Sequence, residues 1–299
     1  MRAESPVAAS DPAAKTLIKN KDPGRLAGMA AMIGSGLSNQ VGAAVGSLAF
    51  PVLGPVGVVT VRQYVAALVL LFFARPRLRS FTWRQWWPVL LLGVVFGTMN
   101  LSLYTAIDRI GLGLAVTLEF VGPLAIALAA TRRRVDLCCA LIAAVGVVAL
   151  MRPRPSADYV GMGLGLLAAT CWASYILLNR IVGRRVPGAE GSAAAATLPA
   201  LMFLPVGVIL VLQQSLTSKA LACAVAAGVL SSAVPYLADL FTLRRVPAQA
   251  FGLFMSVNPV LAALVGWIGL SQRLAWTEWA AIGAIVAANT TSIVTRPRG

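Results

Sequence analysis

The stretch that decides the fold is Leu114-Ala-Val-Thr-Leu-Glu-Phe-Val-Gly-Pro-Leu-Ala-Ile-Ala-Leu128, which is apolar enough to lie in lipid. It nevertheless contains a carboxylate, Glu119, and a proline one helical turn later, Pro123. A charged side chain at membrane depth is costly unless it is paired, hydrated or protonated, so such residues face the interior of a helix bundle. Pro123 lacks the amide hydrogen that would bond the carbonyl of residue 119, and a freed carbonyl is tolerated only beside protein or water. We therefore expect this helix to border a polar cavity.

The same stretch has a counterpart 136 positions later in the chain. Glu119-Phe-Val-Gly-Pro123 aligns without a gap with Met255-Ser-Val-Asn-Pro259, and Arg109-Ile-Gly-Leu-Gly aligns with Arg245-Val-Pro-Ala-Gln. An internal repeat that includes a pair of membrane helices indicates a chain built from two similar halves. The expected parts are a polar cytoplasmic tail and two five-helix repeats, over residues 1–25, 26–151 and 160–295.

The composition is typical of a membrane protein. Hydrophobic residues make up 59% of the 299 residues, charged residues make up 12%, and the mean hydropathy is +0.82, whereas a soluble domain is about half apolar and one-quarter charged. The net charge of +15 does not indicate a nucleic-acid partner here, because the Lys and Arg residues lie between apolar runs. The four cysteines form no CxxC pair and histidine is absent, so we expect no metal site, no cofactor and no enzyme activity.

Apolar runs of about 20 residues, the length that crosses a bilayer as a helix, recur ten times. The fold class expected is therefore an all-α integral membrane protein with ten transmembrane helices, five in each half. The approximate limits are 26–50, 56–74, 87–107, 111–131, 135–151, 160–182, 191–213, 219–242, 247–270 and 275–295.

The connections between these runs differ strongly in charge. The two termini and the connections on their side of the membrane hold 19 Lys and Arg residues, and the connections on the other side hold 5. Because positively charged segments stay in the cytoplasm, both termini are predicted to be cytoplasmic. Five spans is an odd number, so the second half must cross the membrane in the opposite direction to the first. The expected arrangement is an inverted 5+5 repeat, which many secondary transporters use to open alternately to either side.

Two charged residues are expected at a similar depth in different spans. Arg62 lies about six residues into the second span and Glu119 about eight into the fourth, which is ~9 and ~12 Å below the same surface. Arginine stays charged at any ordinary pH. One interpretation is a permanent structural ion pair. The other is that the two groups meet the carboxylate and ammonium of a small zwitterionic substrate, or exchange protons.

Other polar and aromatic side chains lie on helical faces that can line the same cavity. In the third span, Asn100 and Tyr104 share a stripe with two glycines that leave room beside them. In the ninth span, Asn258 precedes Pro259, the counterpart of Pro123, and helices broken at matching points of both halves indicate a central site. Ordinary helix packing is the alternative for each. The candidates for substrate binding are Asn39, Arg62, Asn100, Tyr104, Glu119, Tyr175, Tyr236 and Asn258, and those for proton coupling are Glu119 and Asp239.

Five sequence blocks carry a resemblance to a known family. They are Phe50-Pro51-Val-Leu-Gly54-Pro-Val-Gly57-x4-Arg62, Gly93-x3-Gly97-x-Met99-Asn100, Leu118-Glu119-Phe120-x-Gly122-Pro123-Leu124, Cys171-Trp172-Ala173-x-Tyr175-Ile176-Leu177 and Pro235-Tyr236-x2-Asp239. In these blocks the chain resembles the bacterial threonine/homoserine exporter family, within the drug/metabolite transporter superfamily with EamA-type repeats. It departs from that pattern at the end of the ninth span, where Ser271-Gln272 replaces the usual Gly-Glu.

The resemblance implies a secondary transporter that exports small neutral, threonine- or homoserine-like amino acids across the cytoplasmic (inner) membrane, driven by an ion gradient such as that of protons. The alternative is export of another small metabolite or a drug, such as a nucleobase, a pigment or a toxic compound. A zwitterion needs both signs of charge in one small site, which Arg62 and Glu119 supply, whereas a drug needs a wide aromatic cavity. We therefore expect a monomeric or homodimeric amino acid exporter in a lipid bilayer.

Overall fold

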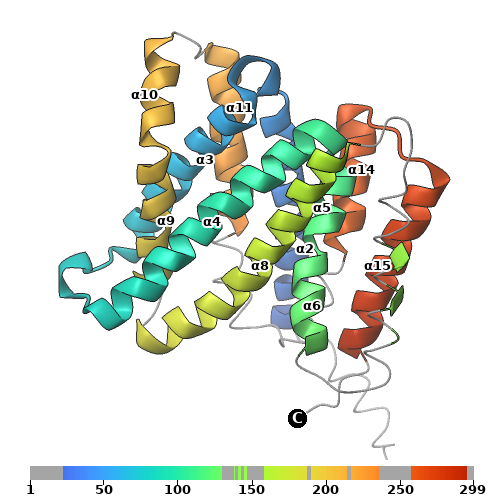
Figure 1. The fold of residues 1–299 in the computed structure, drawn as a ribbon, viewed down its shortest axis with the longest axis horizontal. Helices are drawn as coiled ribbons and strands as arrows, with labels where there is room; N and C mark the ends of the chain where they lie inside the picture. Colours follow the sequence, from blue (N-terminus) through green and yellow to red (C-terminus); the bar gives the residue numbers. More distant parts are fainter. Residues whose placement is uncertain are drawn as a thin grey trace, which may run out of the picture.

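The computed structural model describes residues 23–129, 138, 141–142, 145–146, 158–186, 190–213, 217–235 and 257–294. Every regular element in these residues is a helix (Figure 1), which confirms the all-α fold. Residues 1–22 of the predicted tail and most of the predicted fifth span lie outside the described residues.

The helices follow one another with short connections. Their bounds are α2 Pro23–Ser47, α3 Phe50–Ala74, the 3-10 turn η1 Leu78–Ser80, α4 Trp83–Ile110, α5 Leu112–Glu119, α6 Val121–Ala129, α8 Tyr159–Arg185, α9 Glu190–Met202, α10 Leu204–Leu212, α11 Ser218–Gly228, the π-helical segment η2 Val229–Ala233, α14 Asn258–Leu270 and α15 Trp276–Val294.

Several of these helices match the thickness of a membrane. Among the described residues, α3, α4 and α8 are each long and apolar enough to cross it. The pair α9 and α10 meets the same test as one span that bends by 44° at a short break. The structure is thus that of a helical membrane protein, while the number of ten spans and their symmetry stay predictions.

The starts of two helices can be compared with the predicted spans. The second span is predicted from residue 56, and the backbone of α3 is not helical at Gly54 (φ 64°, ψ 168°), so the long part of α3 begins directly after this kink and only a short helical piece from Phe50 precedes it. Glycine adopts this left-handed φ without steric cost. The third span was expected from residue 87, but α4 begins at Trp83, because Thr82 and Gln85 form a capping box ahead of the apolar run.

Helices from the two predicted halves pack closely together. Helix α4 lies along α8 and α9, α5 lies against α8 and α14, and α2 lies against α11 and α14 (Figure 1). Glycines allow some of these contacts: a side chain at Gly122 in α6 would collide with the carbonyl of Ala169 in α8. Small residues of this kind let membrane helices approach at backbone distance.

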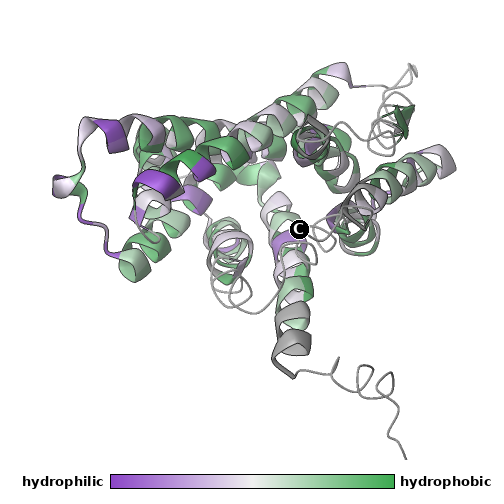
Figure 2. Cartoon of the chain, turned by 90° about the horizontal axis from the view of Figure 1, so that it is seen from below, coloured by the Kyte–Doolittle hydropathy of each residue, from purple (hydrophilic) through white to green (hydrophobic). Residues whose placement is uncertain are grey.

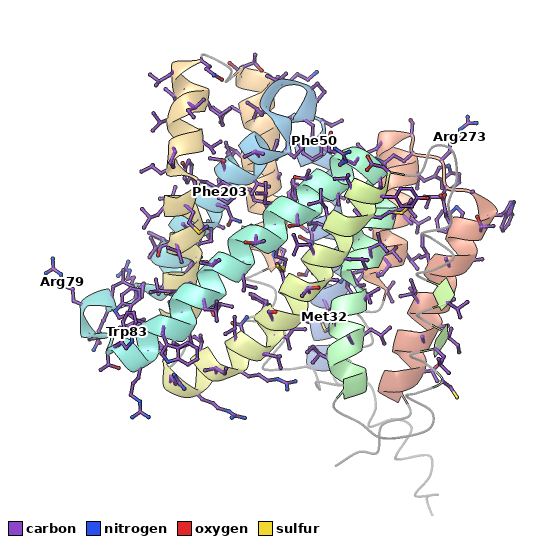
Figure 3. The ribbon with its side chains drawn as sticks, in the orientation of Figure 1. Met32, Phe50, Arg79, Trp83, Phe203 and Arg273 are labelled. Atoms are coloured by element: carbon purple, nitrogen blue, oxygen red, sulfur yellow. The ribbon has the colours of Figure 1, made fainter. Side chains whose placement is uncertain are left out.

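The connections gather at two ends of the bundle, which we call the upper and lower ends after Figure 3. Phe50 and Arg273 lie near the upper end, and Arg79 and Trp83 lie near the lower end. The α4–α5 turn at Gly111 belongs to the upper end, together with the connection between α14 and α15. The α3–α4 connection belongs to the lower end, where the backbone N–H of Arg77 donates to a carboxylate oxygen of Glu190 at 3.2 Å.

Candidate functional site

The stretch around Glu119 forms two helices rather than one. Helix α5 ends at Glu119 and α6 begins at Val121, with Phe120 between them at φ −66° and ψ −13°. Pro123 has no amide hydrogen for the carbonyl of Glu119, so the regular bonding pattern is interrupted at this point. Across the break, the N–H of Leu124 still donates to the carbonyl of Phe120 at 3.4 Å. The carboxyl group is thereby placed at the end of a short helix in the middle of the bundle.

The matching stretch of the second half also contains a helix end. Helix α14 begins at Asn258, directly before Pro259, and both residues are buried. Proline is well tolerated at the first turn of a helix, where its missing N–H has no partner to lose. Asn258 is thus presented at a helix start, as Glu119 is presented at a helix end.

A small cavity of about 50 Å³ lies between these two breaks. Five of the eight predicted substrate-binding residues line it, contributed by α2, α3, α4, α5 and α14. A cavity of this size has room for a few water molecules. The lining residues are Asn39, Gln40, Ala43, Arg62, Leu103, Tyr104, Val116, Glu119, Phe120, Trp172 and Asn258.

Arg62 is buried in the wall of this cavity, with 9% of its surface exposed. Its Nη2 donates to the carbonyl of Ser231, in the π-helical segment η2, at 3.3 Å. Its guanidinium also lies over the ring of Tyr104, 4.9 Å from the ring centroid. Because a guanidinium has five N–H donors, it can still bind an anion in the cavity.

Glu119 is also buried, with 6% of its surface exposed, and it lines the same cavity. Arg62 and Glu119 are both described residues, and they form no ion pair within 4.0 Å of each other. The permanent structural ion pair is therefore not the arrangement in this conformation. The two groups offer opposite charges to whatever occupies the space between them.

Tyr104 adds an unsatisfied polar atom to the site. The side chain is fully buried, and its hydroxyl has no hydrogen-bond partner among the described residues. Leaving such a group unpaired costs about 1–3 kcal/mol. A ligand oxygen in the cavity would remove that cost, so Tyr104 is a candidate donor beside Arg62.

The remaining predicted residues lie elsewhere. Asn100 is buried, but its Nδ2 donates to the carbonyl of Phe96 at 2.8 Å, one turn below the cavity wall on α4. Tyr175 packs against the ring of Phe96 with centroids 5.9 Å apart. The structure does not bring these two to the cavity, and Tyr236 and Asp239 fall outside the described residues.

Six of the eleven lining residues were not among the predicted ones, and Gln40 and Phe120 are two of them. Gln40 is 2% exposed and follows Asn39 on α2. An amide in an apolar run needs a hydrogen-bond partner, so the argument that selects Asn39 from the sequence applies equally to Gln40. Phe120, which meets Trp172 edge-to-face at 4.7 Å, lies at the break itself.

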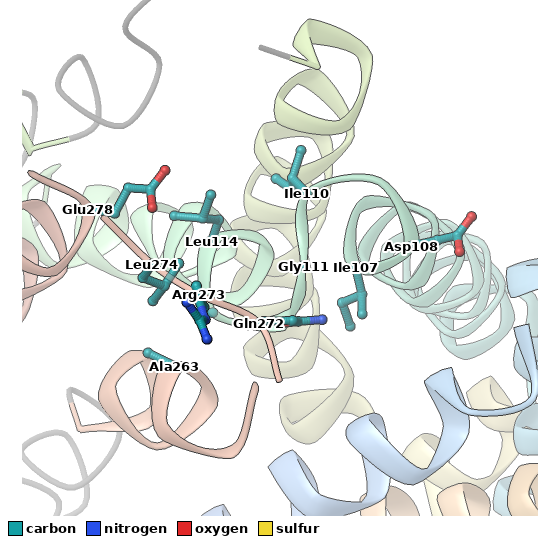
Figure 4. A pocket seen from close by; sticks show the side chains of 11 residues that line it. Ile107, Asp108, Ile110, Gly111, Leu114, Ala263, Gln272, Arg273, Leu274 and Glu278 are labelled. Carbon is teal, nitrogen blue, oxygen red and sulfur yellow. The ribbon is translucent and has the colours of Figure 1, made fainter. Parts of the chain in front are cut away.

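A larger pocket of about 390 Å³ opens at the upper end, between the α4–α5 turn and the α14–α15 connection. In Figure 4, Asp108 and Glu278 lie at its two sides, with Gln272 and Arg273 between them. The Oε1 of Gln272 accepts the N–H of Leu112 at 2.9 Å, which fastens the α14–α15 connection to the start of α5.

The pocket and the cavity follow the same helices. Ile107 of the pocket is one helical turn above Leu103 of the cavity on α4, and Gly113 is nearly one turn above Val116 on α5. One turn of helix spans about 5.4 Å. The pocket therefore lies over the upper side of the cavity, separated from it by about one layer of side chains.

Known proteins share this sequence and fold. The EamA-like transporter family matches residues 159–293. The threonine/homoserine exporter RhtA of Escherichia coli (strain K12) is 36% identical over 261 residues, which cover 86% of this chain and 88% of that protein. The threonine/homoserine exporter RhtA of Salmonella typhimurium is 36% identical over 264 residues with the same coverage. One crystal structure of another protein has a TM-score of 0.57 at 17% identity and covers 90% of this chain and 97% of that chain, which supports the fold alone.

These relatives confirm the predicted resemblance and the prediction of a transporter rather than an enzyme. The identity and the coverage are high enough to place the whole chain in one family with them. The chain belongs to the threonine/homoserine exporter family of EamA-like transporters.

Proposed function

We propose that the protein is a secondary exporter of small neutral amino acids, threonine- or homoserine-like, which works by alternating access in the cytoplasmic membrane. The observation that carries this proposal is the arrangement of Arg62 and Glu119, which are both buried, line one cavity and form no ion pair with each other. Opposite charges held apart in a small space are complementary to a zwitterion. The names of the relatives support the same substrate class.

In this proposal Arg62 binds the carboxylate of the substrate and Glu119 binds its ammonium group. A guanidinium can hold a carboxylate through two parallel hydrogen bonds, which fixes orientation as well as charge. The unpaired hydroxyl of Tyr104 donates to the same carboxylate or to a hydroxyl of the substrate. When the substrate leaves, Glu119 is the candidate to carry a proton in its place.

The alternative substrate, a drug or another bulky metabolite, fits the cavity less well. Pockets for drug-sized molecules have volumes of about 300–1,000 Å³, whereas this cavity measures about 50 Å³ and its lining includes two charged groups and three amides. Even a small amino acid requires the surrounding helices to separate slightly. A drug-sized molecule would require the whole centre of the bundle to open.

We also propose ten spans as an inverted 5+5 repeat with both termini cytoplasmic. The helix break after Glu119 and the helix start at Asn258 lie at matching positions of the two halves, which supports the repeat. Exposed arginines concentrate at the lower end, which supports a cytoplasmic lower end and an external upper end. The larger pocket near Gln272 is then the outer exit, closed in this conformation from the cavity below it.

Uptake of labelled threonine into inside-out membrane vesicles tests the proposed function. We expect uptake that depends on the protein and on an imposed proton gradient, with competition by homoserine and serine but not by a nucleobase or a hydrophobic cation. An Arg109→Gln variant, altered at an exposed arginine that does not line the cavity, is the matched control and should transport normally. Competition by the hydrophobic cation alone would favour the alternative substrate class instead.

Labelling of single introduced cysteines tests the proposed topology. Reagents that do not cross the membrane should reach positions in 51–55 and 217–218 from outside the cell, but not positions in 75–85. The opposite pattern would invert the orientation and refute the assignment of the upper end as the exit.

A further inference from the structure

The lower end of the bundle carries a dense group of exposed arginines. They come from two segments about one hundred residues apart, the α3–α4 connection with the start of α4, and the end of α8. Neither segment contains a lysine. We call this group the lower basic patch, and it comprises Arg75, Arg77, Arg79, Arg84, Arg184 and Arg185.

Specific contacts join the two segments into one surface. The Nη1 of Arg185 donates to the carbonyl of Arg84 at 2.8 Å, and the Nε2 of Gln85 donates to the carbonyl of Arg185 at 2.9 Å. The guanidinium of Arg185 also lies over the ring of Trp87, 4.8 Å from its centroid. Figure 2, which views the molecule from below, shows hydrophilic residues gathered at these helix ends. Arg84 and Arg185, one from each segment, are therefore held side by side by the fold.

The charges of the patch are not neutralised within the described part of the protein. None of its six guanidinium groups has a described carboxylate within 4.0 Å. Glu190, the acidic residue beside them, accepts from the backbone N–H of Arg77 and not from a guanidinium. At the upper end, by contrast, Arg109 is paired with Asp158 at 2.9 Å. The patch is thus a concentrated positive surface whose guanidinium groups form no ion pair with a described carboxylate.

Large apolar rings border the same surface. Trp83 is 72% exposed and Trp87 is 38% exposed at the start of α4. Phe72 and Phe73, at the end of α3, are 68% and 52% exposed, and the guanidinium of Arg75 lies 5.9 Å from the centre of the Phe72 ring. Exposed Trp residues at helix ends are typical of the level of lipid headgroups. The arginines next to them lie where lipid phosphates lie.

We propose that the lower basic patch is a binding site for an anionic phospholipid headgroup, with its phosphate held by Arg84, Arg185 and their neighbours and its acyl chains lying along the exposed rings of α3 and α4. Basic clusters at the cytoplasmic ends of membrane helices bind such headgroups. The planar guanidinium of these arginines matches the geometry of a phosphate and can bind it through two hydrogen bonds. Binding here would fasten α8, of the second half, to α3 and α4, of the first. The site does not depend on the proposed substrate.

Lipid retention by the purified full-length protein tests the proposal. The protein is delipidated in detergent, titrated with phosphatidylglycerol, cardiolipin or phosphatidylcholine, and measured by native mass spectrometry. We expect wild type to bind the two anionic lipids and not phosphatidylcholine. Arg84→Gln with Arg185→Gln should weaken this binding at least about tenfold, since each basic residue near an anionic surface contributes measurably. The matched control, Arg109→Gln with Arg273→Gln at the upper end, removes the same charge and should bind as wild type does.

Two further experiments distinguish binding of a lipid headgroup from binding of any anion. Arg84→Lys with Arg185→Lys keeps the charge and should lose part of the affinity, whereas full retention would contradict recognition through guanidinium geometry. Inorganic phosphate at millimolar concentration should not displace the lipid, and displacement would assign the patch to a free anion. If the glutamine pair fails to fold, Arg79→Gln with Arg184→Gln, at two exposed positions, replaces it. Equal loss of binding in the upper-end control would overturn the proposal.

Discussion

Two pairs of an arginine and a carboxylate in the described part of this molecule are arranged in opposite ways. At the upper end, Arg109 Nε lies 2.9 Å from Asp158 Oδ2, and the two side chains are 41% and 30% exposed. In the central cavity, Arg62 and Glu119 are buried and face the same space without forming an ion pair. The exposed pair is in contact and the buried pair is not.

The difference indicates which pair serves structure and which serves ligand binding. An exposed ion pair contributes at most about 1 kcal/mol, and the Arg109–Asp158 pair also fastens the end of α4 to the start of α8. Two buried charges stabilise a fold only when they are in good contact with each other. Arg62 and Glu119 do not meet this condition, which supports the proposal that a zwitterionic ligand binds between them.

Neutralising one charge of the central pair should have the largest effect. We expect Glu119→Gln to fold, because the amide has nearly the same shape, and to lower threonine transport at least about 30-fold, as removing one partner of a buried charge pair does. The pH dependence that a titrating carboxyl group imposes on transport should also disappear. Both are measured with purified protein in liposomes at several pH values.

The upper pair is the control for that experiment. Asp158→Asn and Arg109→Gln should change transport less than about twofold, as expected for an exposed ion pair. Wild-type rates with unchanged pH dependence in Glu119→Gln would show that Glu119 is structural. Arg62→Gln should lower transport as strongly as Glu119→Gln, since the proposed site uses both charges.

The packing of α6 against α8, beside the break after Glu119, should give the next largest effect. A methyl group at Gly122 would collide with the carbonyl of Ala169, so Gly122→Ala forces α6, and with it the break after Glu119, away from α8. Overpacking of this kind costs about 1–3 kcal/mol, which lowers the melting temperature and the folded yield. Gly163→Ala on α8 meets nothing within 4 Å and should be neutral or stabilising. Equal melting temperatures of the two variants would contradict the close contact.

The sequence predicts the depth of Arg62 and Glu119 in the membrane, but not how each side chain is rotated about the axis of its helix. The spacing along each span placed Arg62 and Glu119 at one level, and both line the cavity. Whether two side chains at one level touch depends on how each helix is turned and on how far apart the axes lie. Those quantities arise from packing across the whole bundle, so the sequence left an ion pair and a shared ligand as open alternatives.

The stripe on α4 shows the same limit. Asn100 and Tyr104 lie on one helical face, as expected from their spacing, but only Tyr104 lines the cavity. On α4 the lining consists of Leu103 and Tyr104, whereas Asn100, one turn lower, bonds the carbonyl of Phe96. Residues that share a helical face point in the same direction, which the sequence predicts. How far the cavity extends along that face depends on the helix breaks after Glu119 and before Asn258.

Removing the hydrogen bond between Gln272 and Leu112, which lies above the cavity, should have a moderate effect. Gln272→Ala removes the acceptor for the N–H of Leu112, which costs about 0.5–1.5 kcal/mol and loosens the α14–α15 connection at the proposed exit. We expect a slightly lower melting temperature and faster modification of an introduced cysteine at Ala263, which lines the pocket. Lys219→Ala, at an exposed residue that does not line the pocket, is the control. An unchanged modification rate in Gln272→Ala would show that this contact does not close the exit.

The smallest effect is expected at Asp158, and it has a defined dependence on pH. The N–H of Gly161, at 2.8 Å, and the guanidinium of Arg109 hold the pKa of this carboxyl below its ordinary value. A lowered pKa in the folded state means that the ionised form contributes stability at pH values above the unfolded pKa, about 3.9, and that this contribution is lost as the pH falls through the folded value. Asp158→Asn retains an oxygen that can cap Gly161 and removes only the charge. Its melting temperature should therefore lie slightly below that of wild type at pH 7 and approach it as the pH falls below 4, while transport stays unchanged. A pH-independent difference would attribute the effect to the cap and not to the charge, whereas a change in transport would contradict the purely structural role of the upper pair.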